Sequence, residues 1–135
     1  MANEWTKVEL YGANNDGNPI RYTCASGAAI AKGSLLILSD PRTGAAHTTT
    51  VGGYCAGIAA MDKSATDHST SISAWTDGVF EAVASGAITV GHPVKSSNEA
   101  NKIEAATNAV IGSAILGYAM ETASDGETIN VRLRL

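Results

Sequence analysis

The feature that most constrains the fold is a stretch of sequence that occurs twice. The segment ASGAAIAKGSLLIL, residues 25–38, resembles ASGAITVGHPVK, residues 84–95. Residues 56–75 likewise resemble residues 116–134, and all matches lie about 59 positions apart. Because a solenoid needs at least three repeats, two copies predict a compact double unit instead. We therefore expect one β domain over residues 20–135, with an internal duplication over about 25–75 and 84–134.

Short segments in which apolar and polar residues alternate, separated by turn residues, run through most of the chain. Alternation of this kind is typical of half-buried strands, and strands that begin every 8 to 12 residues or so indicate a sandwich or barrel. The predicted fold class is all-β: a compact barrel or sandwich, in which a β-tulip-like form is one option. The predicted strands are 21–24, 34–38, 47–51, 55–60, 70–75, 78–84, 93–95, 102–104, 114–120 and 128–135. A helical turn within residues 106–116 is the alternative for that Ala-rich stretch, although Gly112 and Gly117 disfavour it.

The last predicted strand has the clearest alternation. It follows the tight-turn pair Asp125 and Gly126 and carries apolar residues at every second position. Such a strand is expected to complete a sheet or to pack in a seam between subunits. Its apolar face consists of Ile129, Val131, Leu133 and Leu135.

The N-terminal segment, residues 1–19, differs from the rest in composition. Residues 5–11 alternate as a short strand would, and the Gly- and Asn-rich stretch that follows favours turns over regular structure. We predict an extended arm followed by a flexible loop, mobile until a partner orders it. Trp5 and Tyr11 are the large side chains that would anchor this arm.

Charge and composition restrict the possible partners and compartments. The formal net charge is −4 and only 16% of the residues are charged, whereas binding to a nucleic-acid backbone requires clustered Lys and Arg. We find no apolar run long enough for a membrane span and no secretory leader pattern, so neither is expected. Cys24 and Cys55 form no C-x-x-C pair and are predicted to be reduced, partly buried thiols.

The residues that usually carry catalysis or bind metals do not form a recognisable pattern. His47, His68 and His92 lack the spacing of a metal site. Ser26 and Ser85 lack the G-x-S-x-G frame of a nucleophile elbow, and the acidic residues are scattered over predicted turns. We therefore predict no enzyme activity, no cofactor and no metal.

The second copy resembles the small capsid cement, or decoration, proteins of tailed phages. Those sequences contain G-x-P-V, a loop, G-x-A and a final G-E-x-I-x-V-x-L, and the resemblance spans about residues 20–135 here. The matching positions are Gly91, Pro93, Val94, Gly117, Ala119, Gly126, Glu127, Ile129, Val131 and Leu133.

The resemblance implies an all-β structural protein that is made in the host cytoplasm and sits on the outer surface of an icosahedral head. It implies the major capsid protein as partner, and often a homotrimer at threefold or quasi-threefold positions. Trp75 is equally suited to a core position, because it lies on an alternating strand. The candidates for contact with the capsid or with another subunit are Trp5, Val8, Leu10, Tyr11, Trp75, Leu133 and Leu135.

Two other classes of function compete with this interpretation. A carbohydrate-binding or adhesin-type β module would usually place aromatic side chains along a shallow surface, and an aromatic content of 5% disfavours it. A small β-barrel enzyme would need a catalytic constellation, which the sequence lacks.

Overall fold

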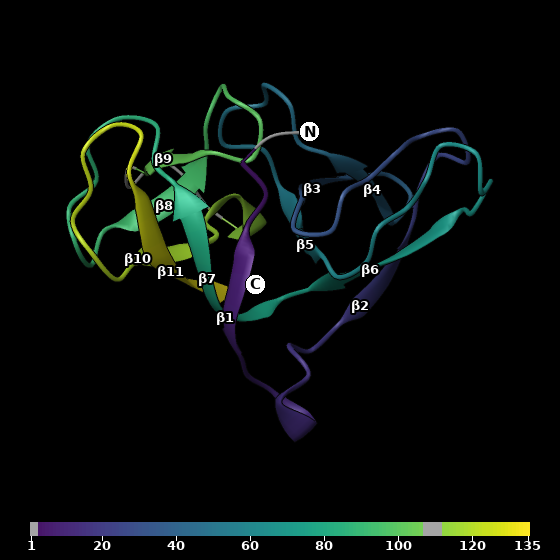
Figure 1. Cartoon of the computed structure of the whole chain (residues 1–135), viewed down its shortest axis with the longest axis horizontal. Coiled ribbons are helices and arrows are strands. Elements are labelled where there is room, and N and C mark those ends of the chain that lie inside the picture. The colour runs from purple at the N-terminus through teal and green to yellow at the C-terminus, as the bar shows by residue number, and fades with distance from the viewer. Residues whose placement is uncertain (1–2, 107–111) are drawn as a thin grey trace.

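The computed structural model describes residues 3–106 and 112–135, and these residues form strands and two short 3-10 helices without an α-helix. The strands form two lobes with β1 between them (Figure 1). The all-β prediction is therefore confirmed. The first lobe is a closed barrel in the order β2 (Ile20–Thr23), β4 (Thr43–Ala46), β3 (Leu35–Ser39), β5 (Cys55–Ala59) and β6 (Ser71–Trp75). The second is a six-stranded sheet in the order β1 (Thr6–Leu10), β7 (Asp77–Val83), β11 (Thr128–Arg134), β10 (Gly117–Ala119), β8 (Pro93–Ser96) and β9 (Ile103–Ala105).

Two of the predicted strand positions are wrong. The strand expected at 47–51 lies earlier, as β4, and His47 just after it is fully buried. The strand expected at 114–120 begins only at Gly117, because the 3-10 helix η2 (Gly112–Ala114) precedes it. The helical turn considered within 106–116 is present in part as η2, and residues 107–111 lie outside the described residues.

The two lobes share one pattern of strand pairing. In the barrel, β3 pairs with β4 and β5, and β6 pairs with β5 and β2. In the second sheet, β8 pairs with β9 and β10, and β11 pairs with β10 and β7. A parallel contact between Thr23 and Thr43 closes the barrel, and a parallel bridge between Ala84 and Ile103 is its counterpart. The repeated sequence segments thus occupy matching places in the two lobes.

A glycine occupies a matching position in one strand of each lobe: Gly57 lies within β5, and Gly117 is the first residue of β10. Gly57 has φ 146° and Gly117 has φ 156°, a backbone region that favours glycine. A Cβ atom at Gly57 would collide with the carbonyl oxygen of Trp75, and one at Gly117 with that of Arg132. The close approach of these neighbouring strands therefore requires glycine in both copies.

The hydrophobic core has two parts joined through β3. The smaller part fills the barrel and includes Leu36 and Ile72, together with several alanines. The larger part surrounds Phe80 in the second sheet and includes Leu35 from the barrel. Because adjacent residues of a strand point to opposite faces, Leu35 and Leu36 each serve a different part. The barrel wall is thus shared between its own interior and the second sheet.

The two cysteines are free thiols that belong to different parts of the core. Cys24 is in the barrel interior and Cys55 is in the larger cluster. Burial raises the pKa of the Cys55 thiol to about 12, because the interior solvates a thiolate poorly. Cys55 is therefore protonated throughout the neutral pH range.

The N-terminal segment is part of the fold, so the prediction of a mobile arm is wrong for the stretch around Trp5 and β1. β1 pairs with β7 in antiparallel fashion, and Trp5 is only 3% exposed. Its ring meets the ring of Phe80 edge-on, with 6.1 Å between centroids. The prediction of a mobile arm rested on the polar composition of residues 12–18. That composition carries no information about the pairing of β1 with β7, which lies far along the chain.

We predict that a Cys24→Ser variant, in which Cys55 is the remaining thiol, reacts very slowly with a thiol reagent such as Ellman's while folded. At about pH 8 a thiol of such high pKa is roughly 10⁻⁴ ionised, and only the thiolate attacks. The rate should rise about tenfold per pH unit while the protein stays folded. Fast labelling of the native variant at neutral pH would contradict the buried position of Cys55.

We also predict that Trp5→Ala lowers the free energy of unfolding by about 3–5 kcal/mol, because it removes a buried aromatic side chain. Val8→Ala is the matched control on the same segment, since Val8 is 48% exposed, and it should change stability by less than about 0.5 kcal/mol. Urea denaturation followed by far-ultraviolet circular dichroism, a signal that comes mainly from the backbone, measures the free energy of unfolding of both variants. Equal stability of the two variants would show that Trp5 is not a core residue.

Candidate interface on the edge strand

Strand β1 lies at an edge of the six-stranded sheet and is the most exposed strand of the N-terminal region. One side pairs with β7, and on the other side no strand of the described residues is paired with it. Its first four residues are exposed, and Val8 is the largest apolar side chain among them. A sheet edge of this kind offers backbone N–H and C=O groups to another chain.

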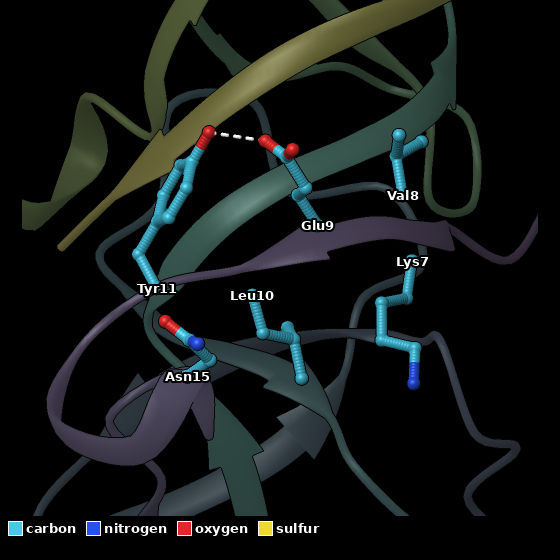
Figure 2. Close-up of a pocket in the computed structure, with 6 residues that line it drawn as sticks. All are labelled: Lys7, Val8, Glu9, Leu10, Tyr11 and Asn15. Carbon is cyan, nitrogen blue, oxygen red and sulfur yellow. Dashed lines mark hydrogen bonds between the residues drawn. The ribbon is translucent and has the colours of Figure 1, made fainter.

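The register of β1 shifts between Lys7 and Glu9, which places a bulge at Val8. In Figure 2, Val8, Glu9 and Tyr11 project to one side of β1, and Lys7 and Leu10 project to the other. Bulges twist an edge strand and limit open-ended pairing, so this edge favours a single defined partner over aggregation. A hollow of about 420 Å³ beside the strand is lined by Lys7, Val8, Glu9, Leu10, Tyr11 and Asn15.

Backbone hydrogen bonds hold β1 at both ends. Trp5 N donates to Gly33 O at 2.8 Å ahead of the strand. Tyr11 N donates to Asp77 O at 3.3 Å after it, and Gly17 N donates to Tyr11 O at 2.7 Å. The exposed edge therefore lies on a segment that is fixed at each end.

A buried polar cluster secures the start of the strand. We call Trp5, His47 and Asn101 the Asn101 node. The indole Nε1 of Trp5 donates to Asn101 O at 2.9 Å, and Leu35 N donates to Asn101 Oδ1 at 2.9 Å. Asn101 N donates to His47 Nδ1 at 2.9 Å, while His47 Nε2 lies 2.9 Å from Ser97 O. Since Nδ1 accepts, the imidazole is the neutral tautomer with its proton on Nε2.

The conformation of Asn101 suits it to this position. Its φ is 62°, in the left-handed region that asparagine tolerates better than most residues. Its side-chain oxygen and its backbone N–H and C=O all face buried partners. The Asn101 node thereby joins the segment ahead of β1, the barrel and the β8–β9 loop.

The outer face of the sheet holds Tyr11 at the end of β1. The Arg132 guanidinium lies over the Tyr11 ring, 4.6 Å from its centroid, and forms an ion pair with Asp77. The Tyr11 hydroxyl donates to the Glu9 carboxylate, as Figure 2 shows. That hydrogen bond to a carboxylate raises the pKa of Tyr11 above its usual value, with burial adding to the effect and the charge of Arg132 opposing it. The ring is therefore held by Arg132 on one face and by Glu9 at its hydroxyl.

The structure separates the predicted contact residues into two groups. Trp5, Trp75 and Leu133 are buried in the larger core cluster, so they supply packing and not an open surface. Val8 and Leu135 are exposed, at 48% and 39%. The alternation of the C-terminal strand had placed Leu133 and Leu135 together, but the strand β11 ends at Arg134, ahead of Leu135.

Leu10 and Tyr11 are half-buried, at the end of β1. Leu135 lies across β7 from β1, and its N–H donates to Thr76 O at 3.0 Å. The surface candidates that the structure brings to this part of the molecule are therefore Val8, Leu10, Tyr11 and Leu135. Sequence reasoning missed Arg132, His47 and Asn101, because their roles depend on partners that are distant in the chain.

Two kinds of site were also sought directly in the described part of the chain. Within residues 3–106 and 112–135, no three or more His, Cys, Asp or Glu side chains are grouped so that they could hold a metal ion. In the same ranges, no helix has the length and apolar character that a membrane crossing requires.

Comparison with known proteins identifies a family and a related fold. Residues 14–135 match the family described as phage cement protein. Among solved structures, the chain is similar to the N base of the head fiber gp8.5 of bacteriophage phi29, with a TM-score of 0.54 and 15% identity. That likeness covers 85% of this chain and 93% of the other, and at this identity it concerns the fold alone. No curated protein matches the chain.

We predict that Glu9→Gln lowers the pKa of Tyr11 toward its ordinary value, because a neutral amide replaces the charged acceptor. The matched control is Glu81→Gln on β7, a carboxylate on a neighbouring strand that is not bonded to the phenol. A pH titration of the Tyr11 ring signals by NMR measures the shift. An identical Tyr11 pKa in the wild type and in Glu9→Gln would show that the hydrogen bond is not formed in solution.

Proposed function

The chain belongs to the phage cement protein family, and from this we propose that it binds the outer surface of an icosahedral phage head and stabilises the lattice of the major capsid protein. The observation that carries the proposal is the family match, which covers residues 14–135. The all-β fold and its likeness to the base of a phage head fiber support a structural protein of the virion. We propose a non-enzymatic role, without cofactor or nucleic acid.

We further propose that the protein acts as a homotrimer at threefold or quasi-threefold positions of the shell. A trimer can engage several capsid subunits at once, so that each contact raises the effective concentration for the next. Modest single interfaces are then sufficient for stable decoration. The small, Ala-rich interior of the barrel also favours burial of further surface between copies.

The surface proposed for contact with the capsid or with a neighbouring copy is the β1 edge, with Val8, Leu10 and Tyr11, together with Leu135. Strand β1 lies ahead of the matched residues 14–135, so its role rests on geometry. It combines unpaired backbone groups with an exposed valine and a fixed tyrosine ring. An extended segment of a partner can add to such an edge by backbone hydrogen bonds, with side chains supplying specificity.

Sedimentation with purified empty heads tests both parts of the proposal. The wild-type protein should saturate the heads, and Val8→Glu should reduce its affinity at least about tenfold, because a buried, unpaired charge at an interface is costly. Val90→Glu is the matched control, because Val90 is similarly exposed, at 53%, but lies between β7 and β8.

Failure of the wild-type protein to sediment with heads would reject the head-binding function. Equal occupancy by Val8→Glu and Val90→Glu would instead reject only the β1 edge as the contact. Light scattering on the free protein and on the two variants reports the oligomeric state, and a monomer at every occupied position on the shell would reject the trimer.

A further inference from the structure

A groove beside strands β2 and β3 of the barrel has a chemical character unlike that of the β1 edge. Its volume is about 610 Å³, and sites for small molecules usually fall between about 300 and 1,000 Å³. Strands β2 and β3, the turn after β3, the residue ahead of β5 and η2 contribute to it. The lining residues are Tyr22, Leu38, Ser39, Asp40, Arg42, Tyr54 and Ser113.

We propose that this groove binds a neutral saccharide through the rings of Tyr22 and Tyr54 and the oppositely charged side chains of Asp40 and Arg42. This binding activity goes beyond capsid decoration and does not depend on it. The strands beside the groove belong to the barrel, whereas the β1 edge belongs to the six-stranded sheet (Figure 1). The groove and the β1 edge are therefore separate surfaces.

The aromatic rings provide the apolar part of the site. Tyr54 is 56% exposed, more than any other large hydrophobic side chain of the described residues, and Tyr22 and Leu38 beside it are half-buried. The C–H face of a pyranose ring can cover an exposed aromatic face while its hydroxyls stay in contact with water. Tyrosine suits this task because it offers a large amphipathic ring with few rotatable bonds.

The backbone around the groove is fixed before any ligand arrives. Leu38 N donates to Tyr54 O at 2.8 Å, which ties β3 to the residue ahead of β5. Thr23 N donates to Arg42 O at 2.9 Å, and Arg42 Nε donates to Arg21 O at 3.0 Å. Tyr22 lies within the pairing of β2 and β6. The site therefore loses little conformational entropy on binding.

The polar groups of the groove remain available to a ligand. Within residues 3–106 and 112–135, no hydrogen bond or ion pair engages the Asp40 carboxylate, the hydroxyls of Tyr22 and Tyr54, or the terminal N–H groups of Arg42. A carboxylate accepts hydrogen bonds and a guanidinium donates them, so together they satisfy neighbouring hydroxyls, which do both. Their charges cancel, which favours a neutral ligand over an acidic or basic one. An apolar protein segment would bury these groups without partners, at a cost in free energy.

NMR titration of the full-length protein with maltose, cellobiose and lactose tests the proposal. At least one of the three should bind with a Kd of about 1 mM or tighter and shift the amide signals of Tyr22, Arg42 and Tyr54. Tyr54→Ala and Asp40→Asn should each weaken that binding at least about tenfold, whereas Tyr54→Phe, which keeps the ring, should retain most of it. Tyr118→Ala on β10 is the matched control and should bind as the wild type does.

Melting curves establish that each variant is folded before titration. If none of the three disaccharides shifts the groove signals, or if the shifts persist in both Tyr54→Ala and Asp40→Asn, the proposal is wrong. It is also wrong if Tyr54→Ala loses head binding while the wild type binds no sugar, since the groove would then be a capsid contact. Head binding by the wild type is measured separately, so its failure would leave the saccharide result intact.

Discussion

The arrangement of the two lobes and of the edge strand depends on the buried hydrogen bonds of the Asn101 node. Asn101 is fully buried, and its polar groups receive bonds from Trp5 and Leu35 and give one to His47. A buried polar group that loses its partner costs about 1–3 kcal/mol, so the loss of any one of these bonds destabilises the fold at this point. Through them, the residue ahead of β1 is attached at once to the barrel and to the second sheet. The position of the exposed β1 edge follows from that attachment.

The two lobes differ mainly in how the edges of their sheets are closed. The barrel closes on itself, and closure leaves no strand edge for a partner. The second sheet stays open and ends on one side at β9, where the bridge between Ala84 and Ile103 lies, and on the other at β1. Strand β1 comes from outside the repeated segments. The second lobe thus has one exposed edge in the N-terminal strand β1, while the barrel carries the separate groove around Tyr54.

Local patterns predicted the all-β class and many of the strands, including β5, β7 and β11, because period-two alternation and turn glycines are encoded within a few residues. They failed where long-range contacts decide the structure. The Asn-rich stretch after β1 indicated a loose arm, yet Trp5 packs against Phe80 far along the chain. The sequence placed His47 in a predicted strand and offered it only as a metal ligand, and no local pattern marked Asn101 as a buried residue. Polar residues in loops are usually solvated, and nothing local marks the ones that are buried.

A reconstruction of phage heads decorated with this protein by electron cryomicroscopy tests the central claim most directly. The account predicts density for the two-lobed chain on the outer surface of the shell, in threefold groups, with Val8 and the rest of the β1 edge against the capsid or a neighbouring copy. Density inside the head, absence of density from the shell, or a β1 edge that faces solvent in every copy would contradict it.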